Sequence, residues 1–370
     1  MKQLWIFLQR EPVLTVAALA ALCSMLAVPP SGAYWQYFDW QVLALLFCLM
    51  AVVAGFQQCG VFDRVSSWLC SRAGTARQIG LVLVLLCFFS SMVVTNDVAL
   101  ITFVPFAILM LSMTEQQRLM PYVIVLQTIA ANLGSMLTPV GNPQNLYLYA
   151  RYHMMAGDFF SATFPVTAVS LLLLLLLCLR IPTQKLEQHK TQYHPAQQQR
   201  LLLISTVLFL CCLCTVFRLV AWPVTLAVVT LVYLLVDRSL LKRVDYGLLA
   251  TFFCFFIFTG NLGQITWIQD ILRQWMQGRE LWVSALCSQV ISNVPAAVLL
   301  SGFTEQGRML LLGCDIGGLG TPVASLASLI SYKAYSRYPA ADCGRYLRLF
   351  LLLNIVLLVL LLGFAQWVLL

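Results

Sequence analysis

Two stretches of this chain share one pattern: TPVGNPQNLYLYARY, residues 138–152, and TPVASLASLISYKAY, residues 321–335. Thr-Pro-Val opens both, and the closing Tyr falls in register. In the first copy Gly and Pro interrupt an apolar run, as they do where a helix breaks. Self-similarity at a fixed offset marks a repeated architecture, so the segments that flank these two stretches are expected to match as well.

The flanking segments match in the same order. Thr95-Asn96-Asp97 corresponds to Ser292-Asn293-Val294, and the run after Asp39-Trp40 resembles the run after Asp245-Tyr246. Each half therefore contains two apolar spans, a hairpin, a broken span and a final span. An unpaired span at 201–218 precedes the second half, so an odd number of crossings separates equivalent points. The two repeats are therefore predicted to have inverted topology.

The composition places the chain in a bilayer. Of its 370 residues, 61% are hydrophobic and only 10% are charged, against about 25% charged in soluble domains. So few charges cannot cover a water-soluble core of this size. This composition excludes soluble enzymes, nucleic-acid-binding modules and disulfide scaffolds. The lipid bilayer is therefore the predicted partner of the apolar surface.

Runs of about 20 apolar residues predict about nine crossings. They lie at about 13–28, 40–57, 119–137, 159–179, 201–218, 221–237, 246–262, 308–320 and 347–369. Two further apolar stretches, 79–112 and 281–303, have polar residues near the middle and are interpreted as re-entrant hairpins. The predicted fold is an all-α polytopic membrane protein with two inverted repeats, two re-entrant hairpins and two broken helices.

The predicted organisation has three parts. Residues 1–180 form the first repeat, with its hairpin at about 79–112 and its broken helix at about 119–156. Residues 181–200, rich in Gln, Lys and His, form a cytoplasmic linker. Residues 201–370 hold the extra span and the second repeat, with its hairpin at about 281–303 and its broken helix at about 308–335.

The basic residues orient this layout. With the N-terminus inside, 17 of the 22 Lys and Arg fall in connections on the cytoplasmic side, and only Arg151, Arg218, Arg273, Arg279 and Arg308 fall outside. Cytoplasmic loops retain Lys and Arg, so this bias supports the count of crossings. The prediction is a multi-pass protein of a bacterial-type inner membrane, with a cytoplasmic N-terminus and an external C-terminus.

Two carboxylates fall within predicted membrane segments. Asp97 lies at the tip of the first hairpin, and Asp315 lies in the second broken helix, where its counterpart is Asn132. A carboxylate in a span costs about 2.5–3.5 kcal/mol, which makes each one a functional candidate. The structural alternatives are a helix N-cap for Asp97 and a hydrogen-bonded interior acid for Asp315. As functional groups, they suit a proton carrier or a cation ligand.

The broken spans supply the remaining candidates. Gly141 permits unusual dihedral angles, Asn142 can cap a helix, and Pro143 suits its first position. The resulting half-helix N-terminus can bind an anion, and unwound carbonyls beside it can coordinate Na⁺. The second break offers Thr321, Ser325 and Ser328 hydroxyls but lacks Gly-Asn-Pro, so its wall is expected to hold fewer ion ligands.

The predicted substrate- and ion-binding set combines the two hairpin tips with the two breaks. Its members are Thr95, Asn96, Asp97, Thr138, Gly141, Asn142, Asn145, Ser292, Asn293, Asp315, Thr321 and Ser325. The three His residues lie in polar connections, so no structural metal and no cofactor are predicted, apart from Na⁺ as a coupling ion. Lys and Arg reach the predicted spans only at their first or last two residues, as Arg218, Arg308 and Arg348 do, which lowers the expectation of a large polyanion as substrate.

These motifs resemble the ion transporter superfamily, which includes arsenite permeases, citrate–metal transporters and divalent-anion sodium symporters. The resemblance rests on TNDVALITFVPFAILML (95–111), LTPVGNPQNL (137–146), SNVPAAVLL (292–300) and LGTPVASLASLI (319–330). It implies an inner-membrane homodimer with a scaffold part and a moving part, and alternating access driven by H⁺ or Na⁺, of which an elevator movement is one form. Asp97 and Val294 stand where the paired Ser-Asn-Thr motifs of the family have Thr.

The sequence therefore predicts a secondary active transporter of a small anion, either an inorganic oxyanion or a carboxylate. One alternative is a Na⁺/H⁺ antiporter in which the two membrane carboxylates bind the transported cations. A more remote alternative is a channel or a membrane-embedded enzyme. Against this last alternative, the chain has no HExxH or GxSxG motif and no His within a span.

Overall fold

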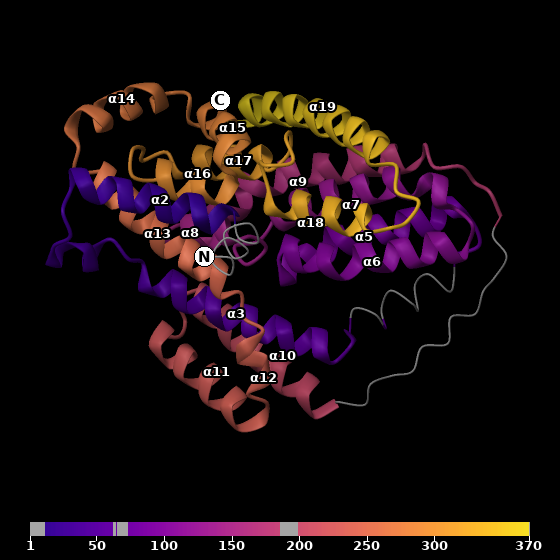
Figure 1. The fold of residues 1–370 in the computed structure, drawn as a ribbon, viewed down its shortest axis with the longest axis horizontal. Helices are drawn as coiled ribbons and strands as arrows, with labels where there is room; N and C mark the ends of the chain where they lie inside the picture. Colours follow the sequence, from indigo (N-terminus) through magenta and orange to yellow (C-terminus); the bar gives the residue numbers. More distant parts are fainter. Residues whose placement is uncertain (1–11, 62–63, 65–72, 186–198, 370) are drawn as a thin grey trace.

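A computed structural model describes residues 12–61, 64, 73–185 and 199–369. Within these ranges all named secondary-structure elements are α- or 3₁₀-helices. The first half contains α2 (Pro12–Ala27), η1 (Gly32–Gln36), α3 (Trp40–Gln58), α5 (Ala76–Val94), α6 (Asn96–Met113), η2 (Gln117–Leu119), α7 (Met120–Ser135), α8 (Pro143–Arg151) and α9 (Ala156–Cys178). The second half contains α10 (Gln199–Val216), α11 (Trp222–Val236), α12 (Ser239–Lys242), α13 (Tyr246–Leu262), α14 (Thr266–Met276), α15 (Glu280–Ile291), α16 (Asn293–Leu300), α17 (Gly307–Gly317), α18 (Leu326–Ser336) and α19 (Cys343–Leu369). Figure 1 shows their arrangement.

The chain is an all-α polytopic membrane protein. Among the described residues, α3, α5, α6, α9, α10 and α19 are each long and apolar enough to cross a bilayer. Four shorter apolar helices, α2, α11, α13 and α15, accompany them. The predicted spans agree with the helices within about four residues at each end. The predicted linker at 181–200 falls largely outside the described ranges.

Equivalent helices of the two halves begin in the same way. Asp39 accepts a hydrogen bond from the backbone N–H of Val42 at the start of α3, and Asp245 accepts one from Leu248 at the start of α13. Each carboxylate satisfies an N–H that has no partner within its helix. The matching Asp-Trp and Asp-Tyr pairs are therefore helix caps, which explains part of the internal similarity.

Both hairpins turn at one residue with a positive φ. Thr95 (φ 79°) separates α5 from α6, and Ser292 (φ 73°) separates α15 from α16. A non-glycine residue rarely adopts this conformation, so the surrounding contacts must hold both tips in it. The first hairpin has arms of 19 and 18 residues, each long enough to span a bilayer, whereas the second has arms of 12 and 8. Re-entrant depth remains a prediction for both hairpins.

The two halves pack through equivalent and reciprocal contacts. Within the halves, α5 packs on α7 and α15 packs on α17; between them, α6 packs on α18 and α16 packs on α8. The helix that precedes α3 or α13 packs against the other half: α2 of the first half lies along α13, and α11 of the second half lies along α3. Each broken helix therefore contacts the hairpin of its own half with its first segment and the hairpin of the other half with its second.

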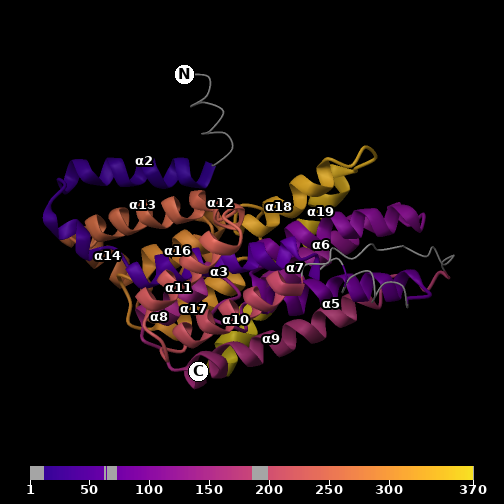
Figure 2. The same ribbon diagram turned by 90° about the horizontal axis from the view of Figure 1, so that it is seen from below.

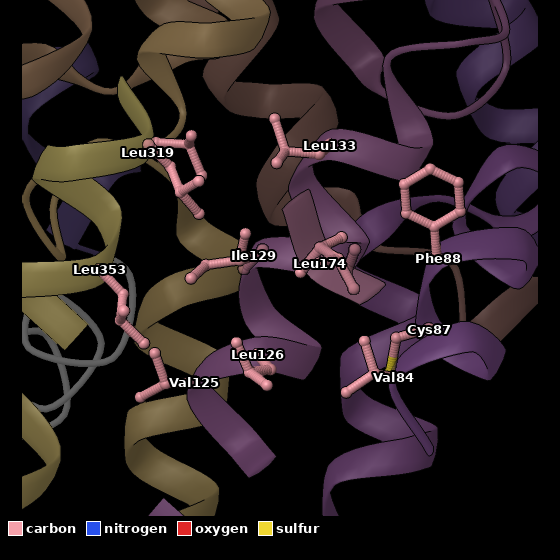
Figure 3. Close-up of a cluster of buried hydrophobic side chains, with 14 of the residues drawn as sticks. Val84, Cys87, Phe88, Val125, Leu126, Ile129, Leu133, Leu174, Leu319 and Leu353 are labelled. Atoms are coloured by element: carbon pink, nitrogen blue, oxygen red, sulfur yellow. The ribbon is translucent and has the colours of Figure 1, made fainter. Parts of the chain in front are cut away.

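The most completely buried helix is α7, which ends directly before the first break. Its side chains Val125, Leu126, Ile129 and Leu133 lie between the α5 side chains and Leu319 and Leu353 of the other half (Figure 3). Because both sides of α7 are covered by protein, a polar residue on it must find its partners inside the fold.

Candidate functional site

Four helices begin around one small chamber. The chamber has a volume of about 10 Å³, and its lining includes the first residues of α6, α8, α16 and α18: Asn96, Pro143, Asn293 and Leu326. Asp97, Gln144, Leu248, Val294 and Ser325 complete the lining. The N-terminus of a helix carries partial positive charge and unsatisfied N–H groups. Four such ends contribute positive potential to the chamber, whereas Asp97 is the one acidic residue in its lining.

Equivalent backbone hydrogen bonds tie each hairpin tip to the break of its own half. The N–H of Asn96 donates to the carbonyl of Gly141 at 3.2 Å, and the N–H of Asn293 donates to the carbonyl of Ala324 at 2.9 Å. The two Thr hydroxyls repeat the arrangement, because Thr138 donates to the carbonyl of Met92 and Thr321 to that of Gln289. Tip and break therefore form one connected unit in each half.

Asn132 joins the two units at the centre. Its side-chain oxygen accepts hydrogen bonds from the Asn96 amide at 3.1 Å and from the Ser325 hydroxyl at 3.0 Å. Its own amide nitrogen donates to the carbonyl of Gly318 at 3.4 Å. Asn96, at the hairpin tip of the first half, and Ser325, in the break of the second half, thus both donate to the buried side chain of Asn132.

Asp315 takes the equivalent place in the second broken helix. It is 1% exposed, and its Oδ1 accepts a hydrogen bond from the Gln144 side chain at 3.2 Å. The side chains of Asn142 and Asn145 lie beside the same carboxylate. Its Oδ2 has no hydrogen-bond partner among the described residues. Asp315 is therefore a hydrogen-bonded interior acid, and its role as a proton carrier or cation ligand stays a prediction.

The unwound carbonyls of the two breaks are satisfied differently. In the first break, the Asn145 amide donates to the carbonyls of Ser135, Met136 and Thr138. In the second, the position of Asn145 is taken by Ser328, and Gln289 from the hairpin donates instead to the carbonyls of Gly317 and Leu319. The breaks are thus held by side-chain amides, and the coordination of Na⁺ by their carbonyls stays a prediction.

Two local expectations about the first break need correction. Gly141 does not adopt a positive φ; it is required because a Cβ there would lie 2.1 Å from the carbonyl oxygen of Ser135. Asn142 stands at the N-cap position of α8, with Pro143 next as predicted, but its side chain makes no capping bond. That side chain lies beside Asp315 instead, because the fold brings the second broken helix against it.

A larger cavity of about 540 Å³ adjoins the chamber. Thr95, Asp97, Asn142 and Pro143 line it at depth, and α3, α13 and α18 supply the walls. Asp97 lies in the first turn of α6, where a carboxylate is favoured by the helix dipole. Asp97 is not at the N-cap position considered for it: the N-cap of α6 is Thr95, which makes no side-chain capping bond, and the Asn96 side chain accepts from the Asp97 N–H. The mouth of the cavity carries Arg243, Asp245 and Lys333, so we name it the Lys333 cavity.

A second cavity, of about 550 Å³, lies at the other ends of the same helices. Its lining includes Asp39 and Trp40 of the α3 start, Tyr147 and Arg151 of α8, and Thr259 of α13; we name it the Arg151 cavity. None of the twelve predicted site residues lines it. Burial raises the pKa of the Asp39 carboxyl here, although the Val42 N–H and Arg151 oppose the effect.

Most of the predicted residues converge, though in several roles. Asn96, Asp97, Asn142, Asn145, Asn293, Asp315 and Ser325 surround the chamber or Asp315, whereas Thr138, Gly141, Ser292 and Thr321 hold tips against breaks. Thr95 forms the first tip and lines the Lys333 cavity. Gln144 and Gln289 were not predicted. Gln144 adjoins the Gly-Asn-Pro run, but Gln289 falls where the other half has Met92, so alignment of the halves gives no signal for it.

The arrangement is that of a polytopic membrane protein with two repeats. The hairpin tips and broken helices of the repeats enclose a polar centre, as they do in transporters. Residues 4–305 match a family model described as citrate transporter. The chain belongs to this citrate transporter family, in agreement with the superfamily expected from its motifs, and it is a membrane transporter rather than an enzyme.

Several relatives carry related descriptions. The inner membrane protein YbiR of Escherichia coli is 32% identical over 302 residues, which cover 80% of each chain. An uncharacterized transporter of Methanocaldococcus jannaschii is 28% identical over 342 residues, covering 89% of this chain and 91% of its own. The silicon efflux transporter LSI3 of Oryza sativa is 28% identical over 143 residues, 38% of this chain and 29% of its own.

Proposed function

We propose that this chain is a secondary active transporter of a small anion, either an inorganic oxyanion or a carboxylate, coupled to H⁺ or Na⁺. The observation that carries the proposal is the convergence of four helix N-termini on one chamber. Helix N-termini attract anions through their N–H groups and dipoles. The substrate is bound at this chamber, in an opening larger than the 10 Å³ described, by Asn96, Asn293, Ser325 and the start of α8.

The two cavities support alternating access. Both are lined by α3, α8 and α13, but at opposite ends of these helices, and only the Lys333 cavity reaches predicted site residues. Movement of the hairpins and broken helices against α3 and α13 would close one route and open the other. Under the charge-bias topology the Lys333 cavity faces the cytoplasm and the described conformation is inward-facing.

The substrate class follows from charge and from the relatives. The family is described as transporting citrate, and one relative is named for silicon efflux. A cavity of about 540 Å³ is within the size of small-molecule sites. Asp97 lines that cavity, and its carboxylate would repel a highly charged anion. Such an anion would need a cation bound beside it to balance its charge, whereas a small oxyanion or a weakly charged acid would not.

The experiment is a thermal-shift screen followed by uptake. The purified protein is melted with arsenite, silicate, dicarboxylates and citrate, each with and without Na⁺, and stabilising anions are then tested in proteoliposomes under imposed Na⁺ and H⁺ gradients. Saturable, gradient-dependent uptake of one of them is expected. Uptake of none, by protein that is folded and reconstituted, would contradict the proposal.

A second candidate is a Na⁺/H⁺ antiporter, favoured by one observation: Asp97 lines the Lys333 cavity, and Asp315 lies behind it with an unpaired oxygen. In this case the carboxylates themselves bind the transported cations. A pH-sensitive dye inside vesicles separates the two functions. A pH change on adding Na⁺ alone, with no candidate anion present, identifies the antiporter.

We further propose a homodimer in a bacterial-type inner membrane, with the N-terminus in the cytoplasm. The localisation is supported by the name of the Escherichia coli relative and by the apolar helices. The orientation is supported by the distribution of Lys and Arg. Crosslinking in native membranes tests the oligomeric state.

A further inference from the structure

The Lys333 cavity and the Arg151 cavity are lined by equivalent positions of the two halves. Three pairs of residues show this, and in each pair the first residue lines the Lys333 cavity and the second lines the Arg151 cavity. The pairs are Met50 and Phe256, counted from the capping Asp of α3 and α13; Ile101 and Val298, counted from the Asn of the two tips; and Ile330 and Tyr147, counted from the two Thr-Pro-Val breaks. The two cavities are therefore one feature that occurs once in each half.

The two cavities differ in how far they reach toward the chamber. Asp97 and Pro143 line both the Lys333 cavity and the chamber, so these two spaces adjoin. Among the described residues, none that lines the Arg151 cavity also lines the chamber. The Arg151 cavity ends instead at Tyr147 and Val298, each about one helical turn after a residue of the chamber. The chamber is thus closed on the Arg151 side.

Tyr147 lies at this closed end. It is 5% exposed, and the centroid of its ring is 5.7 Å from that of Phe256. Its hydroxyl oxygen is 2.8 Å from the hydroxyl oxygen of Ser301. The Ser301 hydroxyl donates its single proton to the carbonyl of Val298, so Tyr147 is the donor in the bond between the two hydroxyls. The ring contact joins α8 to α13, and the hydrogen bond joins α8 to the end of α16.

The equivalent residues on the Lys333 side are apart. On the Arg151 side α16 packs on α13, whereas the equivalent pair, α6 and α3, lines the Lys333 cavity instead of packing together in the described residues. Met50 and Ile330 are half-buried in the lining of this cavity, while their equivalents Phe256 and Tyr147 are buried against each other. One side of the repeat therefore shows the closed contact, and the other shows the same positions open.

We propose that Tyr147 and Phe256 form a gate that closes the chamber toward the Arg151 cavity, and that Ile330 and Met50 form the gate that closes it toward the Lys333 cavity in the opposite state. We name them the Tyr147 gate and the Ile330 gate. The inference rests on the proposed transport function and names the residues that close its two routes. Because the halves are repeats, a contact made on one side indicates the contact made on the other when the arrangement is exchanged.

The two gates differ in chemistry. The closed Tyr147 gate combines an aromatic contact with a hydrogen bond to Ser301, whereas Ile330 and Met50 offer apolar contact alone. The aromatic contact and the hydrogen bond both stabilise the closed Tyr147 gate. They therefore favour the described state at rest. Weakening the Tyr147 gate should shift the population toward the state in which the Ile330 gate is closed.

The test measures one gate while the other is weakened. Met50→Cys and Ile330→Cys are combined in the full-length protein, with and without Tyr147→Ala, and a short thiol-to-thiol crosslinker is added to the purified protein. Mass spectrometry follows the initial rate at which the peptides of positions 50 and 330 become linked, which separates this link from those of native thiols. Tyr147→Ala should raise the rate about tenfold, because the closed Tyr147 gate loses one aromatic contact and one hydrogen bond.

A second variant and a matched control complete the test. Phe256→Met places on α13 the residue that α3 carries at the equivalent position, and it should also raise the rate, so the test survives if Tyr147→Ala fails to fold. The control is Tyr152→Ala. The Tyr152 hydroxyl donates to the carbonyls of Ser301 and Thr304, but this residue is in the lining of neither cavity. The control should leave the rate unchanged. Equal rates in both gate variants and the control would overturn the proposal.

The measurement needs no anion, so it separates the gates from the transport proposal. A change in crosslinking rate without uptake of any anion contradicts the proposed function and leaves the gates standing. Anion uptake by a protein whose crosslinking rate ignores both gate variants contradicts the gates and leaves the function standing.

Discussion

Asn132 and Asp315 occupy equivalent positions, each six residues before a Thr-Pro-Val break, but they differ in how their polar atoms are used. Both polar atoms of the Asn132 side chain are hydrogen-bonded, whereas Oδ2 of Asp315 has no such partner in the part of the chain that the structure describes. The two halves are therefore alike in geometry and unlike in charge at the centre. The neutral position joins the halves, and we propose a ligand-binding role for the acidic one.

Asp315→Asn is expected to abolish concentrative uptake while the protein still folds. Asn already occupies the equivalent position in the other half, so the side chain is compatible with the break. Uptake in proteoliposomes under a Na⁺ gradient should fall to the level of protein-free liposomes, with a normal elution profile of the purified variant. Asp270→Asn, on the exposed face of α14, is the control. Normal uptake with normal ion dependence in Asp315→Asn would return this residue to a structural role.

Asn96→Ala should slow transport more than Asn293→Ala. The Asn96 side chain reaches Asn132 as well as the Asp97 N–H, whereas the bonds of the Asn293 side chain in the described residues stay within its own tip. A lost buried hydrogen bond costs about 1–3 kcal/mol, which is about tenfold or more in rate if it falls on the transport step. Initial uptake rates at equal protein content decide the order, and the reverse order would contradict the unequal roles of the two tips.

Side-specific labelling tests the orientation. Lys333→Cys, at the mouth of the Lys333 cavity, should react with a membrane-impermeant maleimide only from the cytoplasmic side, and Arg151→Cys only from the external side. Both positions are exposed, and the unmodified protein run in parallel corrects for its native thiols. Labelling of both from one side would show that the predicted number of crossings is wrong.

The sequence predicted the helices well because bilayer spans and helix breaks leave strong local signals, whereas the inverted relation of the two repeats stays a prediction. Asp39 and Asp245, the two Thr-Pro-Val breaks, and the Asn residues of the tips are all visible as matched letters. What the sequence could not supply is which side chain of one half meets which of the other. The Asn132–Ser325 and Gln144–Asp315 contacts depend on the packing of α8 and α18 between the halves.

Three residues of the breaks, Gly141, Thr138 and Thr321, make local contacts in the structure that the sequence alone did not predict. Gly141 looks like a residue chosen for its dihedral freedom, but the structure requires it for close approach to Ser135. Thr138 and Thr321 are predicted ion ligands whose hydroxyls donate to hairpin carbonyls in this structure, and their role in ion binding stays a prediction. In each case a residue suited to ligand binding is used to satisfy backbone groups, which any break in a membrane helix must do first.

Gly134→Ala should destabilise the first half more than Gly317→Ala destabilises the second. The two glycines are equivalent and let the first segment of each broken helix approach the hairpin. An added Cβ at Gly134 would lie 2.1 Å from the backbone oxygen of Phe88, whereas at Gly317 the nearest atom is the Ala285 Cα at 2.8 Å. Overpacking of this kind costs about 1–3 kcal/mol. Melting temperatures in detergent measure it, with Gly363→Ala, which has open space around it, as the control. A larger loss at Gly317 would argue against this reading of the contacts.

Gln289→Met should loosen the second break selectively. Its amide nitrogen donates to the carbonyls of Gly317 and Leu319, and its oxygen accepts from the N–H of Thr321 at 2.9 Å. Met fills a similar volume but leaves these three backbone groups unpaired, at about 1–3 kcal/mol for each group that water cannot reach. Hydrogen exchange should therefore rise at residues 317–324 and stay unchanged at residues 134–141, where Asn145 does the equivalent work. Gln274→Met on the exposed surface of α14 should leave both segments unaltered. Equal exchange in the two breaks of Gln289→Met would mean that the second break is held by its hydroxyls alone.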